Sequence, residues 1–173
     1  FASPPQEHYF NCPYQLGYEP LNKDVDLAID AQEFEVPVQP GDLVIAGSDG
    51  LFDNIFDENI ELVVSDALAK VAGAGALSAA RAVSEALVVE ARKNAEDPMF
   101  ESPFAIEAAK AKAIGTAASS KQKGALGAFS ALTTSVASAI SGKKLGGKMD
   151  DITVVVGAVV ATAAAKEDII EAE

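Results

Sequence analysis

The sequence predicts an α+β fold, because two apolar, β-prone runs flank a long region with helical patterning. The first run is Leu43–Ala46, and the second is Ile152–Val156, continued by Ala158–Val160. Between them, apolar residues recur at helical spacing over residues 57–95, and Ser102 marks the start of a further helix. Both runs are continuous rather than alternating, which is typical of strands covered on both faces.

The residues before the first run are predicted to be mostly extended. Prolines interrupt residues 1–33, where His8–Phe10 and Tyr14–Leu16 suit short strands. Phe34–Val36 alternates like a half-buried strand, and Gln39–Asp42 has the Pro-Gly-Asp composition of a turn. This segment is therefore expected to turn directly into the first buried strand.

Three helices are expected between the two runs. Asp57 can cap a helix that begins near Glu58, and Leu77–Ala91 is predicted to form a second helix after a glycine-rich interruption. Ser102 suits the N-cap of a third helix, with Pro103 at its first position.

Residues 111–148 differ in composition from the rest of the chain. They are rich in Ala, Ser, Gly and Lys, and the lysines between 121 and 148 have no acidic counterpart. This composition buries little apolar surface, so we expect a flexible insertion. The alternative is a docking element for an acidic or membrane-associated partner, which would join the chain to a larger protein assembly. Gly124–Ile140 is too short and weakly apolar to predict a membrane span, so membrane contact would arise only through such a partner.

The length of 173 residues and the composition predict one domain, or a large part of one, and we expect residues 1–173 to be a single, incomplete domain. Acidic residues outnumber basic ones by 26 to 13, and the resulting formal charge of −13 argues against a nucleic-acid partner. Cys12 is the only cysteine and His8 the only histidine, which excludes an internal disulfide and a Cys₄ or Cys₂His₂ zinc site.

Aspartates stand at the ends of the two predicted strands. Asp49 follows the first run and Asp150 precedes the second. If the strands pair antiparallel, the two carboxylates converge on one rim of the sheet and repel each other unless a cation compensates their charge. Oxygen ligands without His or Cys point to Mg²⁺ or Mn²⁺. Gly50 gives the backbone room to turn there, and Asp53 lies one turn further on, within reach of the same or an adjacent ion. The alternative is that Asp49 and Asp150 only cap turns.

Two segments resemble the C-terminal signatures of the metal-dependent type 2C protein Ser/Thr phosphatases. They are GDLVIAGSDGLFDN (41–54) and GGKMDDITVVV (146–156), in that order. The opening SPPQEHYFNCPYQLG and the segment DPMFESPF (97–104) resemble a branch of the family with mitochondrial and plastid members. The resemblance covers residues 1–106 and 146–160. It implies a location in a mitochondrion or plastid, and the alternative is a soluble protein elsewhere in the cell.

The resemblance also implies a fold and a chemistry. The family fold is an antiparallel β-sandwich flanked by pairs of helices, and two metal ions activate a water for attack on a phosphoserine or phosphothreonine of a protein substrate. At matching positions, Asp49 with Gly50, and Asp150, are expected in the metal centre, and Asp53 is expected beside an additional, weaker metal. Asp151 is expected to be structural.

The family's N-terminal motifs have no counterpart in this sequence. These motifs supply a further acidic ligand, a phosphate-binding arginine and a general-acid histidine, whereas His8, Arg81 and Arg92 match none of those roles. We therefore expect the C-terminal part of a phosphatase, with about half of a metal centre. The alternatives are a non-catalytic module, structural or regulatory within a larger organellar assembly, and an independent cation-binding domain. We expect the isolated fragment to fold poorly, because half a sandwich exposes an apolar face.

Overall fold

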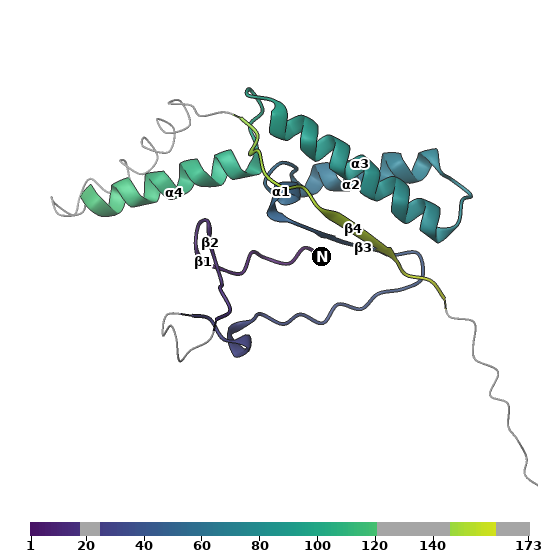
Figure 1. Ribbon diagram of the computed structural model, residues 1–173, viewed down its shortest axis with the longest axis horizontal. Helices are drawn as coiled ribbons and strands as arrows, with labels where there is room; N and C mark the ends of the chain where they lie inside the picture. Colours follow the sequence, from purple (N-terminus) through teal and green to yellow (C-terminus); the bar gives the residue numbers. More distant parts are fainter. Residues whose placement is uncertain (18–24, 121–145, 162–173) are drawn as a thin grey trace, which may run out of the picture.

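The computed structural model describes residues 1–17, 25–120 and 146–161 (Figure 1). The predicted acidic tail at 166–173 and most of the predicted insertion lie outside these residues. The described chain forms, in order, β1 Glu7–Tyr9, β2 Cys12–Pro13, the 3₁₀ helix η1 Ala28–Asp30, β3 Leu43–Gly47, α1 Asp49–Phe52, α2 Asp57–Lys70, α3 Ala76–Glu96, α4 Pro103–Ser120 and β4 Val154–Ala158, so that the four α-helices lie between β3 and β4 in the sequence.

The two apolar runs form one antiparallel pair, as predicted. The register aligns Leu43 with Ala158 at one end and Gly47 with Val154 at the other. The end of β3 and the beginning of β4 therefore lie at the same rim of the sheet, and the short helix α1 starts there (Figure 1). This pairing brings together segments that are about a hundred residues apart in the sequence.

The hydrophobic core lies between the β3–β4 pair and α3. Val83, Leu87 and Ala91 recur at helical spacing along α3 and are fully buried. Leu51 of α1 and Ile55 after it pack into the same cluster. Helix α2 lies against α3 on the same side of the strands (Figure 1). The core therefore fixes α1 against one end of the sheet.

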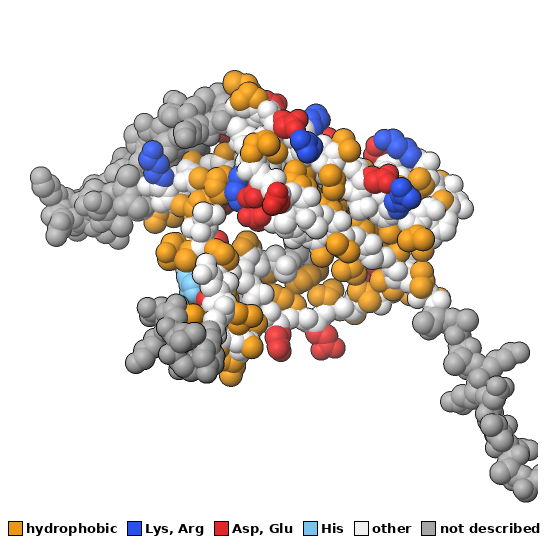
Figure 2. Space-filling view, in the orientation of Figure 1, with side chains coloured by type: hydrophobic (Ala, Val, Ile, Leu, Met, Phe, Trp, Pro, Cys, Tyr) orange, Lys and Arg blue, Asp and Glu red, His pale blue; other side chains and the backbone are white. Residues whose placement is uncertain are grey.

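The opposite face of the β3–β4 pair is open. Val44 is 53% exposed and Val155 is 62% exposed, and hydrophobic side chains reach the surface over this region (Figure 2). The prediction that both strands are covered on both faces is therefore not met within the described residues, where helices cover one face only. Continuous apolar runs are typical of strands that are buried on both faces.

The helices differ from their predicted bounds in ways that local contacts explain. Helix α2 includes Asp57, and Phe56 takes the N-cap position. Helix α3 continues beyond Ala91 to Glu96, because its last turn packs inward and Arg92 pairs with Glu96 at 2.8 Å.

Helix α4 begins as predicted and runs on into the segment predicted as an insertion. The Ser102 hydroxyl accepts a hydrogen bond from the Ala105 N–H at 3.2 Å, which is an N-cap contact. Of residues 111–148, residues 111–120 belong to α4 and 146–148 pack against the core segment, while 121–145 are outside the described residues. No helix among the described residues is both long and apolar enough to cross a membrane.

The N-terminal part contains less sheet than predicted. Outside residues 18–24, which the structure does not describe, the small hairpin of β1 and β2 is the only sheet before β3, and Tyr14–Leu16 contributes no strand beyond a bridge between Leu16 and Asp26. Phe34–Val36 forms no strand, and these residues are exposed within an extended segment that leads to β3. Alternation over three residues was too short a pattern to establish pairing in the absence of a partner strand.

Candidate metal centre

The rim where β3 ends and β4 begins is closed by Ser48. Its hydroxyl donates to the Asp151 carbonyl at 2.7 Å and accepts from the Thr153 N–H at 3.0 Å. The Ser48 N–H in turn donates to the Thr153 carbonyl at 3.0 Å. These bonds continue the sheet by one residue and fix the segment after β3 against the segment before β4.

Gly50 allows α1 to approach the second strand closely. A Cβ at this buried position would lie 2.6 Å from the Asp151 carbonyl oxygen, so only glycine fits without a shift of backbone. The Gly50 carbonyl accepts a hydrogen bond from the Asn54 side chain at 2.9 Å. The structure therefore assigns Gly50 a packing role that holds Asp49 near Asp150.

Three aspartates converge on the ammonium group of Lys148. The Nζ atom lies 2.7 Å from Asp53, 2.9 Å from Asp49 and 3.1 Å from Asp150, in each case measured to a carboxylate oxygen. Figure 2 shows acidic side chains gathered beside a basic one over the region of α1. We call these four residues the acidic cluster. Its existence satisfies the geometric prediction that Asp49 and Asp150 lie within reach of one cation.

The members of the acidic cluster differ in exposure. The Asp49 side chain is 64% exposed and that of Asp150 is 37% exposed, whereas those of Asp53 and Lys148 are 24% and 20% exposed. The ammonium also lies 4.9 Å from the centre of the Phe104 ring, at the start of α4. The cluster therefore has a shielded side at Asp53 and an open side at Asp49.

This environment shifts the pKa of three members. Burial raises the pKa of Asp53, against the lowering effect of its hydrogen bond with Lys148. Burial on its own would lower the pKa of Lys148, but hydrogen bonds to Asp53, Asp49 and Asp150 outweigh it and raise that pKa above its ordinary value. The pKa of Asp150 is lowered first by a hydrogen bond from the Asp151 backbone N–H and then by Lys148.

A buried amide network holds Lys148 in place. The Asn54 side chain donates to the Lys148 carbonyl and accepts from the Lys148 N–H, both at 2.8 Å. The Asn94 side chain of α3 donates to the Asn54 carbonyl at 2.9 Å. At Gly147, any Cβ would collide with the backbone of Asn94 and Ala95, so the segment before Lys148 depends on glycine for its close approach to α3.

The donor set fits a hard divalent ion. Carboxylate oxygens from Asp49, Asp53 and Asp150 already surround one positive charge, and they are the ligands that Mg²⁺ and Mn²⁺ prefer. Within the described residues, however, no group of three or more acidic, His or Cys side chains is arranged so that it could hold a metal ion. The three aspartates are arranged around the ammonium of Lys148 instead. A divalent ion at this point would therefore share the carboxylates with the ammonium or replace it.

Of the other residues considered in the sequence, none joins the acidic cluster. His8 pairs with Asp26 at 2.9 Å, and Arg81 and Arg92 pair with glutamates on their own helix. Sequence reasoning missed the roles of Asn54 and Lys148. Both residues stand inside the two motifs, since Asn54 follows Asp53 directly and Lys148 stands two residues before Asp150, but their contact with each other spans 94 residues and is not indicated by either motif.

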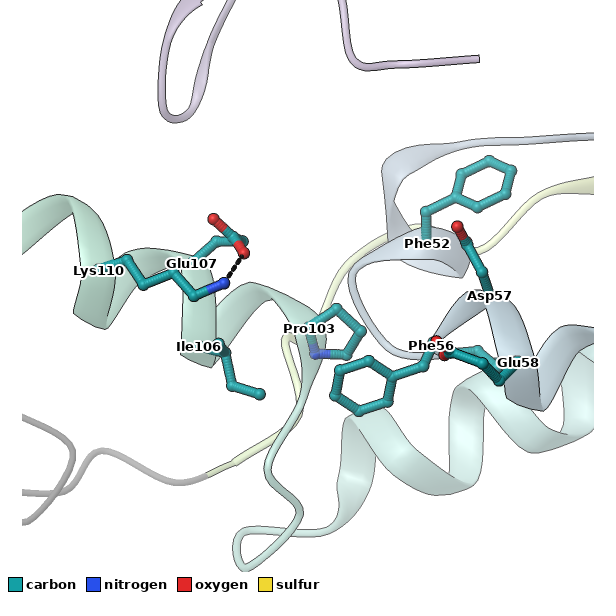
Figure 3. A pocket seen from close by; sticks show the side chains of 9 residues that line it. Phe52, Phe56, Asp57, Glu58, Pro103, Ile106, Glu107 and Lys110 are labelled. Atoms are coloured by element: carbon teal, nitrogen blue, oxygen red, sulfur yellow. Dashed lines mark hydrogen bonds and ion pairs between the residues drawn. The ribbon is translucent and has the colours of Figure 1, made fainter. Parts of the chain in front are cut away.

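A hollow of about 410 Å³ lies between α4 and the start of α2 (Figure 3). Phe52, Phe56, Pro103 and Ile106 supply apolar walls, and Glu107 pairs with Lys110 at its edge at 2.6 Å. None of the aspartates of the acidic cluster lines it, so the hollow does not contain the candidate chemistry.

Comparison with known proteins agrees with these features. No family model matches the chain. The "Probable protein phosphatase 2C 1" of Oryza sativa subsp. japonica is 39% identical over 92% of this chain and 39% of its own length. The "Probable protein phosphatase 2C 26" of Arabidopsis thaliana is 37% identical over 94% of the chain and 44% of its own. The "photosystem II phosphatase PBCP", known from an X-ray structure, is 37% identical, with a TM-score of 0.59 over 92% of this chain. The chain is a partial type 2C protein phosphatase-like region.

The chain spans less than half the length of these two plant relatives and 51% of the solved structure. A "Protein phosphatase PTC7 homolog fig" of Drosophila willistoni also matches, with 36% identity over 60% of the chain. The mixed helices and strands agree with the α+β class expected of a type 2C phosphatase-like region.

Proposed function

We propose that this chain is the C-terminal part of a metal-dependent phosphoprotein phosphatase that acts on phosphoserine and phosphothreonine. The observation that carries the proposal is the convergence of Asp49, Asp53 and Asp150 on one positive charge at the rim of the β3–β4 pair. Support also comes from the type 2C relatives, which share this region at 37–39% identity. The substrate would be a phosphoprotein.

In this proposal Asp49 and Asp150 bind Mg²⁺ or Mn²⁺ from the open side of the cluster, with Asp53 reserved for an additional, weaker ion. A bound divalent ion would supply an activated water and stabilise charge on the phosphoryl oxygens. The chain's own contribution is orientation. Gly50 keeps α1 close to the second strand, and the Asp151 N–H holds the Asp150 carboxylate at 2.9 Å.

The test is Mn²⁺-dependent hydrolysis of p-nitrophenyl phosphate by the complete protein. Asp49→Asn is expected to reduce kcat/KM by about 100-fold or more, because several kcal/mol of charge stabilisation are lost with the ligand. Asp66→Asn is the control, since Asp66 is exposed on α2 and pairs with Lys70 of the same helix. Full activity of Asp49→Asn, or no metal-dependent turnover by the complete protein, would refute the proposal that the protein is an enzyme.

The second candidate is a non-catalytic type 2C-like module that serves as a structural or regulatory subunit. It is favoured by one observation, namely that Lys148 already compensates part of the negative charge of the cluster without a metal. Contact with a larger assembly through residues 111–148 belongs to this proposal. So does an organellar location, for which the sequence branch and the photosystem II phosphatase give support.

A further inference from the structure

Lys148 is the only member of the acidic cluster that carries positive charge, and its contacts are complete. An ammonium group has three N–H donors, and here the carboxylates of Asp53 and Asp49 accept hydrogen bonds at 2.7 and 2.9 Å, while that of Asp150 forms an ion pair at 3.1 Å. The Phe104 ring lies near the same group. The side chain is only 20% exposed, unlike those of Lys70, Lys93 and Lys110, which are more than half exposed and pair on the surface of their own helices.

The shortest of these contacts is on the shielded side. Asp53 lies closest to Nζ and is 24% exposed, compared with 64% for Asp49. Asp53 is also joined to Lys148 through the backbone, because the next residue, Asn54, holds the Lys148 N–H and carbonyl. The buried amide therefore fixes the point from which the lysine side chain reaches Asp53.

We infer that Lys148 occupies the Asp53 side of the cluster as a built-in cation, so a divalent ion that binds Asp53 must displace it. The inference rests on the proposed metal dependence and concerns the additional, weaker ion. Asp49 remains accessible from the open side, and the three carboxylates with one ammonium leave a formal charge of −2, which suits one divalent ion there. A second divalent ion next to the ammonium would be repelled by it.

The inference predicts a specific change in metal binding. In Lys148→Met, a neutral side chain of similar length replaces the ammonium, and the Asp53 side is open to a cation. We expect one Mn²⁺ site that depends on Asp53 to tighten by about tenfold or more, since a unit charge at close range is removed. The Mn²⁺ affinity at the more exposed Asp49 side is expected to change less.

The experiment counts bound Mn²⁺ in the complete protein by electron paramagnetic resonance of the free ion, with titration calorimetry for affinity. Lys148→Arg retains the positive charge and is expected to bind Mn²⁺ like the wild type, which separates charge from disturbed packing. Lys70→Met removes an exposed lysine that pairs with Asp66 on α2, and it is expected to change nothing. Circular dichroism checks that each variant is folded.

The decisive variant is the double replacement Lys148→Met with Asp53→Asn. It is expected to lose the tightened site, and Asp53→Asn alone is expected to keep the wild-type sites that fill at low Mn²⁺. Equal binding by the wild type and Lys148→Met would overturn the inference, and so would tightening in Lys148→Arg. A wild type that binds no Mn²⁺ would refute the proposed function, whereas a gained site in Lys148→Met would still support the built-in cation.

Discussion

Asn54 is the side chain on which the geometry of the acidic cluster most depends. It is fully buried, and its amide makes three hydrogen bonds of 2.8 to 2.9 Å, to the Gly50 carbonyl and to both backbone groups of Lys148. Asn54→Ala removes all three and leaves their partners unsatisfied. At about 1 kcal/mol for each bond, with a further penalty for polar groups left buried, the expected loss is about 3 to 5 kcal/mol.

That loss is large compared with the roughly 5–15 kcal/mol by which a domain is stable. Urea unfolding of the complete protein would detect it as a midpoint lowered by about 2 M, for a slope near 2 kcal/mol/M. Asn59→Ala is the matched control, because Asn59 is exposed on α2 and its replacement is expected to change stability by less than about 0.5 kcal/mol. Equal losses in the two variants would refute the role of the Asn54 amide.

Two further predictions concern the close approach at α1 and the N-terminal hairpin. Gly50→Ala is expected to cost about 1–3 kcal/mol in urea unfolding, because the added Cβ would press on the Asp151 carbonyl, whereas Gly75→Ala has open space and should change little. Hydrogen bonds, first from the Gln15 N–H and then from His8, lower the pKa of Asp26, so its contribution to stability is present above about pH 4 and is lost as the pH falls through the lowered value. The protection factors of the β1–β2 amides, which are exchange rates relative to the intrinsic rate at the same pH, should fall on acidification in the wild type and should not depend on pH in Asp26→Asn. Protection factors in Asp26→Asn that fall with pH as in the wild type would contradict this.

The pairing of the two strands and the meeting of Asp49 with Asp150 could be predicted from the sequence. Each strand is predicted by a continuous apolar run in the sequence. An aspartate follows one run and precedes the other, so antiparallel pairing brings the two aspartates to the same rim of the sheet. The Ser102 cap was predictable for the same reason, since its hydroxyl bonds to a backbone N–H only three residues away.

The role of Lys148 was not predictable, because it depends on distances that no local pattern contains. In the sequence it is the last of several lysines in a stretch that predicts a flexible insertion. In the structure, Gly147 approaches α3 and Asn54 holds the backbone of Lys148, from 94 residues earlier in the chain. The contact that distinguishes Lys148 from the other lysines is therefore tertiary.

The acidic cluster depends on the pairing of β3 with β4, because its aspartates come from two separate segments of the chain. Asp49 and Asp53 come from the segment after β3, and Asp150 comes from the segment before β4. Three carboxylates at this distance repel one another, so the pairing of β3 with β4 is opposed by their charge unless a cation is present. Lys148 supplies one positive charge from within the chain, which allows the rim to close before any metal binds. A divalent ion bound to the open side would then add to strand pairing that already exists, so metal binding and stability of the β3–β4 pair should rise together.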